Sequence, residues 1–123
     1  MKLLINAFIV LLSIWMQPSP RVPEGVKEAF RTGSAKSLAQ YMEDKVALTL
    51  PDDDDIYVRS EVQKKLSTFF YANKPSSFVI QFEGGKDANQ YAIGVLKTNN
   101  GDYRVSLLLR SNKISQLRIE KEE

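Results

Sequence analysis

The 123-residue sequence contains no cysteine and no histidine. The absence of cysteine excludes disulfides, a thiol nucleophile and thiolate metal ligands, so packing alone must stabilise the fold. The absence of histidine removes the usual general base with a pKa near neutrality. Acid–base catalysis would therefore depend on carboxylates. The candidate carboxylates lie at the ends of predicted helices or strands, in turns, or on the outer face of the predicted sheet. They are Glu61, Glu83, Asp87, Asp102 and Glu120.

A large excess of charge is also missing. The chain has 17 basic and 15 acidic residues, a net charge of +2, and removal of Lys2 with the leader described below leaves 16 against 15, or +1. Proteins that bind nucleic acid carry a strong basic stripe, so this balance argues against a nucleic-acid partner. Hydrophobic residues make up 43% of the chain, with five tyrosines and six phenylalanines, which is enough for the core of one domain.

One long hydrophobic run lies at the N-terminus. Lys2 precedes it, it spans residues 3–16, and two prolines follow. The run is shorter than the ~20 residues that a membrane-spanning helix needs, and this arrangement is typical of a secretory signal peptide. We therefore predict a signal peptide over residues 1–20 and a single exported domain over residues 21–123, in the periplasm or outside the cell. An uncleaved membrane anchor is the alternative.

The second half of the chain alternates hydrophobic and polar residues with the period of two that is typical of half-buried strands. Four such segments lie between Ser77 and Lys121, separated by short glycine-containing or polar clusters. We predict four consecutive antiparallel strands that form one curved sheet. The residues expected to face the core are Phe78, Ile80, Phe82, Tyr91, Ile93, Val95, Tyr103, Val105, Leu107, Leu109, Ser115, Leu117 and Ile119.

The loops between these strands decide the register, because a slip by one residue moves every side chain to the other face. A three-residue loop at residues 99–101 with a bulge would place Val95 opposite Val105. A second three-residue loop would pair Leu107 with Leu117 in the last hairpin. Both choices put hydrophobic residues on one face, which we expect to be the core.

The opposite face of the predicted sheet carries most of the charge. We interpret it as an interaction surface made of Arg104, Leu108, Arg110, Arg118 and Glu120. Arginine suits bidentate contacts with carboxylates and phosphates. Glu83 is also expected on this face, so carboxylates offset the arginines, which favours a self-complementary homodimer patch over an anion site. The alternative is a solvated face whose exposed ion pairs stabilise the fold by only ~0–1 kcal/mol each.

The first half of the mature chain predicts three helices and a hairpin. A short helix is expected over residues 23–31 and a second one after Ser34. Strands over residues 46–50 and 56–58 would form the hairpin. The longest helix is expected from Ser60 to Asn73, where hydrophobic residues recur at helical spacing.

Four consecutive aspartates, Asp52 to Asp55, form the most conspicuous charge run. Carboxylates bind calcium, but a calcium loop alternates ligands with spacers and includes a glycine for its turn. This run has neither feature. We expect it to be the solvated tip of the hairpin, and we expect neither a metal nor a cofactor.

The order of these elements is similar to the α+β fold called nuclear transport factor two-like or cystatin-like, in which a cone-shaped, curved antiparallel sheet wraps one longer helix. Four stretches resemble an uncharacterised family of small exported proteins from the Bacteroidota. They are residues 22–30, Phe69-Phe70 with Asn73-Lys74-Pro75, residues 91–94 and residues 116–121. The resemblance implies the fold and export, and it implies no activity.

Related folds include isomerases and dehydratases that work in the cup between helix and sheet. The residues expected to line such a cup here are Phe30, Tyr41, Phe69, Phe78, Tyr91 and Tyr103. Two functions follow. The first is a non-enzymatic binding or assembly module that forms a homodimer or binds an envelope protein through the outer face. The second is a carrier of a small apolar ligand, or an isomerase-like enzyme, that uses the cup.

Overall fold

The computed structural model of the protein describes residues 21–122, and the predicted signal peptide lies outside the described residues. Within this range no helix is long and hydrophobic enough to cross a membrane. The elements are α2 (Glu24–Thr32), α3 (Ala35–Ala39), β1 (Met42–Leu50), β2 (Asp53–Val58), α4 (Arg59–Ala72), β3 (Pro75–Lys86), β4 (Asn89–Thr98), β5 (Gly101–Arg110) and β6 (Lys113–Lys121).

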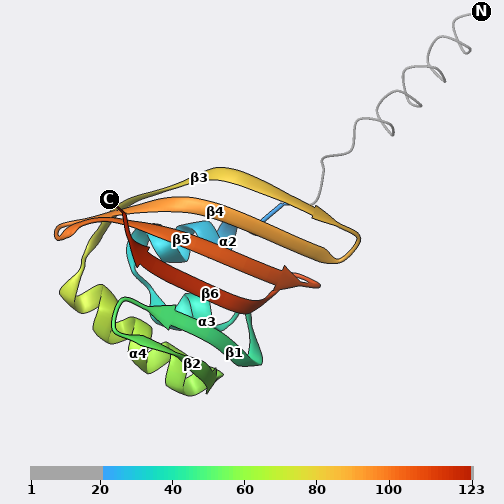
Figure 1. The fold of residues 1–123 in the computed structure, drawn as a ribbon, viewed down its shortest axis with the longest axis horizontal. Helices are drawn as coiled ribbons and strands as arrows, with labels where there is room; N and C mark the ends of the chain where they lie inside the picture. Colours follow the sequence, from blue (N-terminus) through green and yellow to red (C-terminus); the bar gives the residue numbers. More distant parts are fainter. Residues whose placement is uncertain (1–20, 123) are drawn as a thin grey trace, which may run out of the picture.

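Six strands form one sheet in the order β2-β1-β6-β5-β4-β3 (Figure 1). The four predicted consecutive antiparallel strands are confirmed as β3 to β6. The predicted hairpin is also confirmed, and it extends the same sheet because β1 pairs in parallel with β6. This parallel pairing joins strands that are far apart in sequence, and a pattern of alternation along the chain does not predict it.

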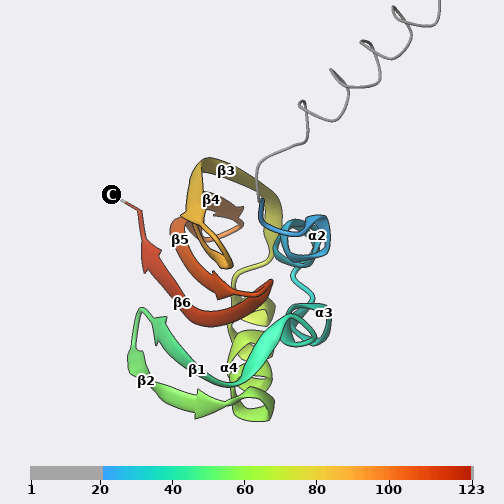
Figure 2. The same ribbon diagram turned by 90° about the vertical axis from the view of Figure 1, so that its right-hand side faces the viewer.

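The sheet curls from β3 to β2, and α2, α3 and α4 lie on its concave side (Figure 2). The predicted α+β fold, with a curved sheet wrapped on one longer helix, is confirmed. The centre of the cone is hydrophobic: Phe30, Leu38, Leu66 and Leu117 are completely buried. Phe30 of α2 joins the helices to the sheet, since its ring centroid lies 6.4 Å from that of Phe70 on α4 and 4.8 Å from that of Phe78 on β3.

The helix ends follow from their sequences. Gly33 ends α2 in the left-handed conformation (φ 71°), which glycine adopts without steric cost. Ser34 then caps α3 by accepting a hydrogen bond of 3.2 Å from the backbone N–H of Ser37. The long helix α4 begins at Arg59, directly after β2, within one residue of its predicted start.

The predicted pairing of β4 with β5 is wrong by one residue. Thr98 pairs with Gly101 across a two-residue turn, so Val95 lies opposite Arg104. The inward position opposite Val105 is taken by Gly94. The reason is space, because a Cβ atom at Gly94 would lie only 3.0 Å from the ring of Phe78. Two of the inward positions at the middle of β4 therefore hold the small residues Ala92 and Gly94, and Tyr91, Ile93 and Val95 face outward.

A bulge reverses the expected faces at the end of β3. The register shifts between Ile80 and Phe82, so Phe82 faces outward although it was expected in the core. Glu83 then pairs with the buried Ala92 on the inner face, whereas it was expected on the outer face. Its carboxylate accepts a hydrogen bond of 3.3 Å from the backbone N–H of Val22.

The last hairpin pairs as predicted: Leu107 lies opposite Leu117, and Arg104 opposite Glu120. Its turn is shorter than expected. Ser111 and Asn112 form a two-residue turn with positive φ angles of 51° and 65°. A shift of register at Leu108/Leu109 supplies the extra residue that the prediction placed in the loop.

Candidate functional site

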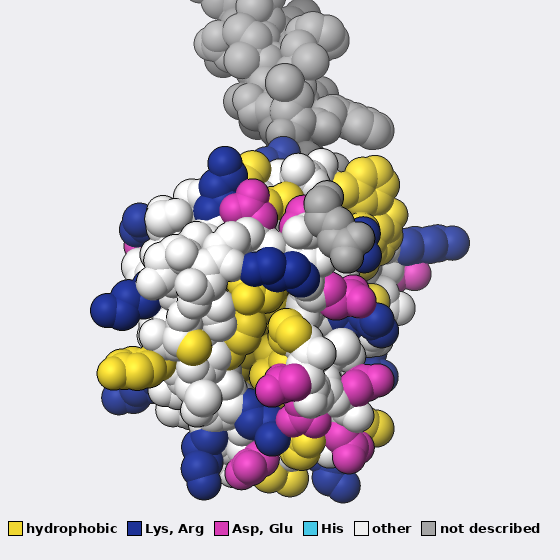
Figure 3. Space-filling model, turned by 60° about the vertical axis from the view of Figure 1, so that its left-hand side comes forward, with side chains coloured by type: hydrophobic (Ala, Val, Ile, Leu, Met, Phe, Trp, Pro, Cys, Tyr) yellow, Lys and Arg dark blue, Asp and Glu magenta, His cyan; other side chains and the backbone are white. Residues whose placement is uncertain are grey.

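The mouth of the cone contains a cavity of about 600 Å³ between α4 and the β1–β2 hairpin. On this side of the molecule, hydrophobic side chains lie at the bottom of a hollow and acidic side chains gather along one margin (Figure 3). A volume of this size falls within the usual range for small-ligand pockets. The mouth is therefore the first candidate site.

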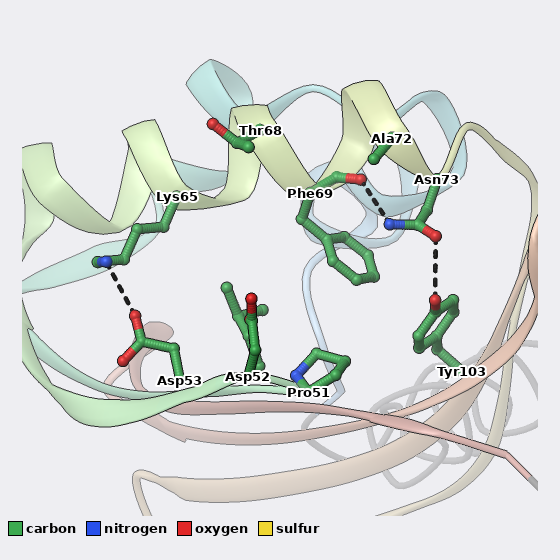
Figure 4. Close-up of a pocket in the computed structure, with 10 residues that line it drawn as sticks. Pro51, Asp52, Asp53, Lys65, Thr68, Phe69, Ala72, Asn73 and Tyr103 are labelled. Carbon is green, nitrogen blue, oxygen red and sulfur yellow. Dashed lines mark hydrogen bonds and ion pairs between the residues drawn. The ribbon is translucent and has the colours of Figure 1, made fainter.

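Three segments contribute the hydrophobic part of this mouth pocket. Leu50 ends β1 and Pro51 begins the turn after it, Phe69 and Ala72 come from α4, and Tyr103 comes from β5 (Figure 4). The rings of Phe69 and Tyr103 meet edge to face with centroids 5.0 Å apart. Both residues are almost fully buried, so they form a firm wall rather than a mobile rim.

Asn73 holds the polar end of the same wall. Its side-chain amide donates a hydrogen bond of 3.0 Å to the carbonyl oxygen of Phe69, in the last turn of α4. The Tyr103 hydroxyl donates to the amide oxygen of Asn73 at 3.0 Å (Figure 4). Lys121 lies over the Tyr103 ring, 4.7 Å from its centroid. The tyrosine thus joins the end of α4 to the sheet.

The opposite side of the mouth pocket carries a compact charged group. The Lys65 ammonium lies 2.8 Å from the Asp53 carboxylate (Figure 4), and the Tyr57 hydroxyl donates to the same carboxylate at 2.7 Å. The ammonium also lies 4.6 Å from the centroid of the Tyr57 ring. The ammonium of Lys65 is therefore held between a carboxylate and the face of an aromatic ring.

These contacts shift three pKa values. The hydrogen bond from Lys65, and then that from Tyr57, lower the pKa of Asp53. The bond to Asp53 raises the pKa of Lys65 and, in the same way, that of Tyr57. Asp53 is therefore an ionised carboxylate with low basicity, suited to binding a cation more than to removing a proton.

The predicted cup residues divide into three groups. Phe69 and Tyr103 line the mouth pocket. Phe30 and Phe78 pack on each other with ring centroids 4.8 Å apart and belong to the core, and Tyr41 is half-buried against it. Tyr91 lies on the outer face, because the register of β4 differs from the prediction.

The sequence pattern missed Asp53 and Lys65 at this site. Alternation along β2 places Asp53 and Tyr57 on one face, which was a usable signal. The approach of Lys65 from α4 depends on how the helix packs over the hairpin, and no local pattern encodes it. Within residues 21–122 no cluster of three or more potential metal ligands is present.

The outer face of the sheet is the second candidate site. Arg104, Leu108, Arg110, Arg118 and Glu120 all face outward, as predicted for this surface. Glu120 is 3.8 Å from Arg104 and 3.4 Å from Arg118. Arg110 pairs instead with Glu43 of β1 at 2.7 Å.

A hydrophobic patch lies beside these charges, and the sequence pattern missed it. The outer patch consists of Val79, Phe82, Tyr91, Ile93, Val95 and Leu108. Val79 and Phe82 are 58% and 56% exposed, so more than half of each side chain faces solvent. The rings of Phe82 and Tyr91 lie 5.7 Å apart. A dip of about 210 Å³ lined by Tyr91, Ile93 and Leu108 continues the patch onto β5.

Comparison with known proteins identifies relatives of the whole fold. The family model described as "Domain of unknown function (DUF4783)" matches residues 23–120. A solved DUF4783 family protein from Bacteroides ovatus is 34% identical with a TM-score of 0.79, and the match covers 85% of this chain and 99% of that one. None of the curated proteins matches this chain.

More distant structures share the fold alone. An NTF-2 like protein of unknown function from Burkholderia xenovorans is 13% identical with a TM-score of 0.61, covering 81% of this chain and 80% of that one. A domain with a cystatin-like fold from Nostoc punctiforme is 11% identical with a TM-score of 0.66, covering 81% and 72%. The predicted resemblance in fold and in family is confirmed.

Proposed function

We propose that this chain, which belongs to the DUF4783 family, acts as an exported, non-enzymatic binding module that forms a homodimer through the outer face of its sheet. The observation that carries the proposal is the outer patch. Monomeric proteins rarely leave a large contiguous hydrophobic surface in water. Six neighbouring hydrophobic residues on β3, β4 and β5 are best explained by a protein partner.

A second copy of the chain suits this surface for two reasons. The sheet presents a broad face, and a twofold dimer requires only that one patch fit itself. The charges beside the patch have both signs: Arg104, Arg110 and Arg118 against Glu43 and Glu120, or +1 in total. The charged residues beside the outer patch of two copies can therefore meet without strong repulsion. They would form the polar border that protein interfaces have around a hydrophobic centre.

The association state of the purified protein tests the proposal. Sedimentation velocity should detect a dimer at micromolar concentration. Phe82→Asp places a charge in the outer patch, where its burial in an interface would be costly, and should weaken the dimer at least ~100-fold. Arg118→Ala removes a rim charge and should weaken it by about fivefold.

Ile56→Asp is the matched control, since Ile56 is 65% exposed but lies on β2, at the other edge of the sheet. It should leave the dimer unchanged. A monomeric wild-type protein, or a Phe82→Asp variant that dimerises like the wild type, would refute dimerisation through this face. Native mass spectrometry of the protein from its own cell envelope would then identify any other bound partner.

The mouth pocket favours a second function, the carriage of a small ligand. A cavity of about 600 Å³ with an aromatic wall and an oriented ion pair has the composition of a binding site. The two functions are compatible, because the mouth pocket and the outer patch lie on different surfaces of the sheet.

A further inference from the structure

We infer that the mouth pocket takes a small ligand that combines an aromatic or aliphatic body with a protonated amine, and that this amine enters the position that Lys65 holds between Asp53 and Tyr57. The inference rests on the proposed ligand-carrying function and adds its chemical class. It does not depend on the dimer.

The first step of the argument is the balance of charge at the mouth. Asp52, Asp53 and Lys65 line the mouth pocket, and Asp54, Glu120 and Lys121 line the adjoining hollow at the hairpin tip. Glu120 is paired with Arg104 and Arg118 on the outer face, so Asp52, Asp53 and Asp54 remain against Lys65 and Lys121, a net charge of −1. A negative rim attracts a cation and repels a carboxylate or phosphate.

The second step is that the chain already places ammonium groups here. Lys65 lies over the Tyr57 ring at 4.6 Å and Lys121 over the Tyr103 ring at 4.7 Å. The two tyrosine rings at the mouth therefore each hold a cation, and Lys65 has the Asp53 carboxylate at 2.8 Å as well. This carboxylate and the Tyr57 ring form a site for an ammonium group that the protein itself occupies.

The third step is that the uncharged polar side chains of the mouth pocket are already bonded within the protein. The Thr68 hydroxyl donates to the Lys64 carbonyl oxygen. The Tyr103 hydroxyl and the Asn73 amide bond each other and the end of α4. The walls that remain for a ligand body are the hydrophobic surfaces of Leu50 and Phe69. A hydrophobic body with one ammonium group matches this lining.

Lys65 lies on α4 and is only partly exposed, and its flexible side chain can leave the site without unfolding the helix. A ligand amine and the Lys65 ammonium then compete for one position. Removal of Lys65 should therefore strengthen the binding of an amine, whereas loss of a residue that contacts a ligand directly usually weakens binding.

The test is a titration followed by the NMR spectrum of ¹⁵N-labelled protein, with three probes that share a phenyl ring on a short chain and differ in charge. They are 2-phenylethylamine, 2-phenylethanol and 3-phenylpropionate. The amine should shift the signals of residues 50–53, 65–73 and 103 and should bind the wild type more tightly than either other probe. In Lys65→Met the amine should bind about fivefold to tenfold more tightly, as expected for one freed charge-assisted contact.

Lys64→Met is the matched control, because it removes the same charge from the next, exposed position of α4. It should leave the affinity for the amine near that of the wild type. Asp53→Asn should weaken amine binding in the Lys65→Met background by about tenfold, with no effect on the alcohol. Circular dichroism confirms that each variant is folded.

Equal effects of Lys65→Met and Lys64→Met on the amine would overturn the inference, as would binding of the propionate at least as tight as that of the amine. Binding of the alcohol or the acid alone would leave the ligand-carrying function in place and refute only the class of ligand. Absence of binding by all three probes at the mouth pocket would count against both.

Discussion

β4 and β5 are neighbours in the sheet, but they distribute their hydrophobic residues in opposite ways. β5 directs Val105, Leu107 and Leu109 into the core. The middle of β4 directs the small residues Ala92 and Gly94 inward and Tyr91, Ile93 and Val95 outward, and only Leu96 near its end is a large hydrophobic residue in the core. The inner space beside β4 is already filled by Phe30 and by Phe78. The strand can therefore present its large side chains to a partner, and this is the origin of the outer patch.

The largest expected effect on stability comes from Leu107 of β5, and the adjacent Leu108 provides the comparison. Leu107 is 3% exposed and Leu108 is 39% exposed. Leu107→Ala leaves a cavity in the core and should reduce the free energy of unfolding by about 3 kcal/mol. Leu108→Ala should cost less than about 1 kcal/mol. Urea unfolding at a protein concentration low enough to populate the monomer measures both, and equal losses would contradict the assignment of faces.

Two glycines, Gly94 on the inner face and Gly84 on the outer face, allow a second comparison of the two faces, with a smaller expected effect on stability. At Gly94 a Cβ atom would lie 2.8 Å from the Val79 carbonyl oxygen and 3.0 Å from the Phe78 ring. Gly94→Ala should therefore reduce the free energy of unfolding by about 2 kcal/mol, because the inner face of β4 has no spare space.

Gly84→Ala is the control on the outer face. Its Cβ atom would also meet a neighbour at 3.0 Å, but this neighbour is the hydroxyl end of the exposed Tyr91 side chain, which can move away. The variant should unfold at nearly the wild-type temperature in a thermal scan. A loss of stability as large as that of Gly94→Ala would mean that the outer face is as tightly packed as the core.

The same contrast explains how far the sequence could predict the fold. Alternation identified all four strands of the second half, and it gave the correct pairing of β5 with β6, where one face is uniformly hydrophobic. It failed for β4, because both faces of that strand are apolar: Tyr91 and Ile93 on one, Ala92 and Leu96 on the other. When two registers both bury hydrophobic residues, the space left by side chains from other elements selects the register. The sequence of the strand alone does not contain that information.

The two candidate sites were predictable to different degrees. The charged residues of the outer face follow from the register of the last hairpin, which the sequence predicts well. The outer patch depends on the bulge before Phe82, and the mouth pocket depends on the packing of α4 over β2. Phe69 and Tyr103 were expected in a cup because of their spacing. Asp53 was expected only as part of a solvated turn, since its contact with Lys65 joins two elements.

The smallest expected effect on stability concerns the ion pair between Asp53 and Lys65 at the mouth pocket. The pKa of Asp53 in the folded protein lies below its value in the unfolded chain, about 3.9. A lowered carboxyl pKa stabilises the fold above that value, and the contribution is lost as the pH falls through the folded pKa. The raised pKa of Lys65 sets the upper pH limit of the stabilisation by this ion pair. The contribution of Lys65 to the free energy of unfolding is complete below about pH 10, and it is lost as the pH rises through the raised pKa.

Asp53→Asn should therefore melt below the wild type at about pH 6, and the difference should shrink as the pH is lowered toward about 2, because the wild-type carboxyl then becomes neutral as well. Asp87→Asn, which changes the same charge in the exposed β3–β4 turn, should melt with the wild type throughout. A difference for Asp53→Asn that does not change with pH would show that the substitution acts through packing. Lys65 would then be held at the mouth by the Tyr57 ring more than by charge.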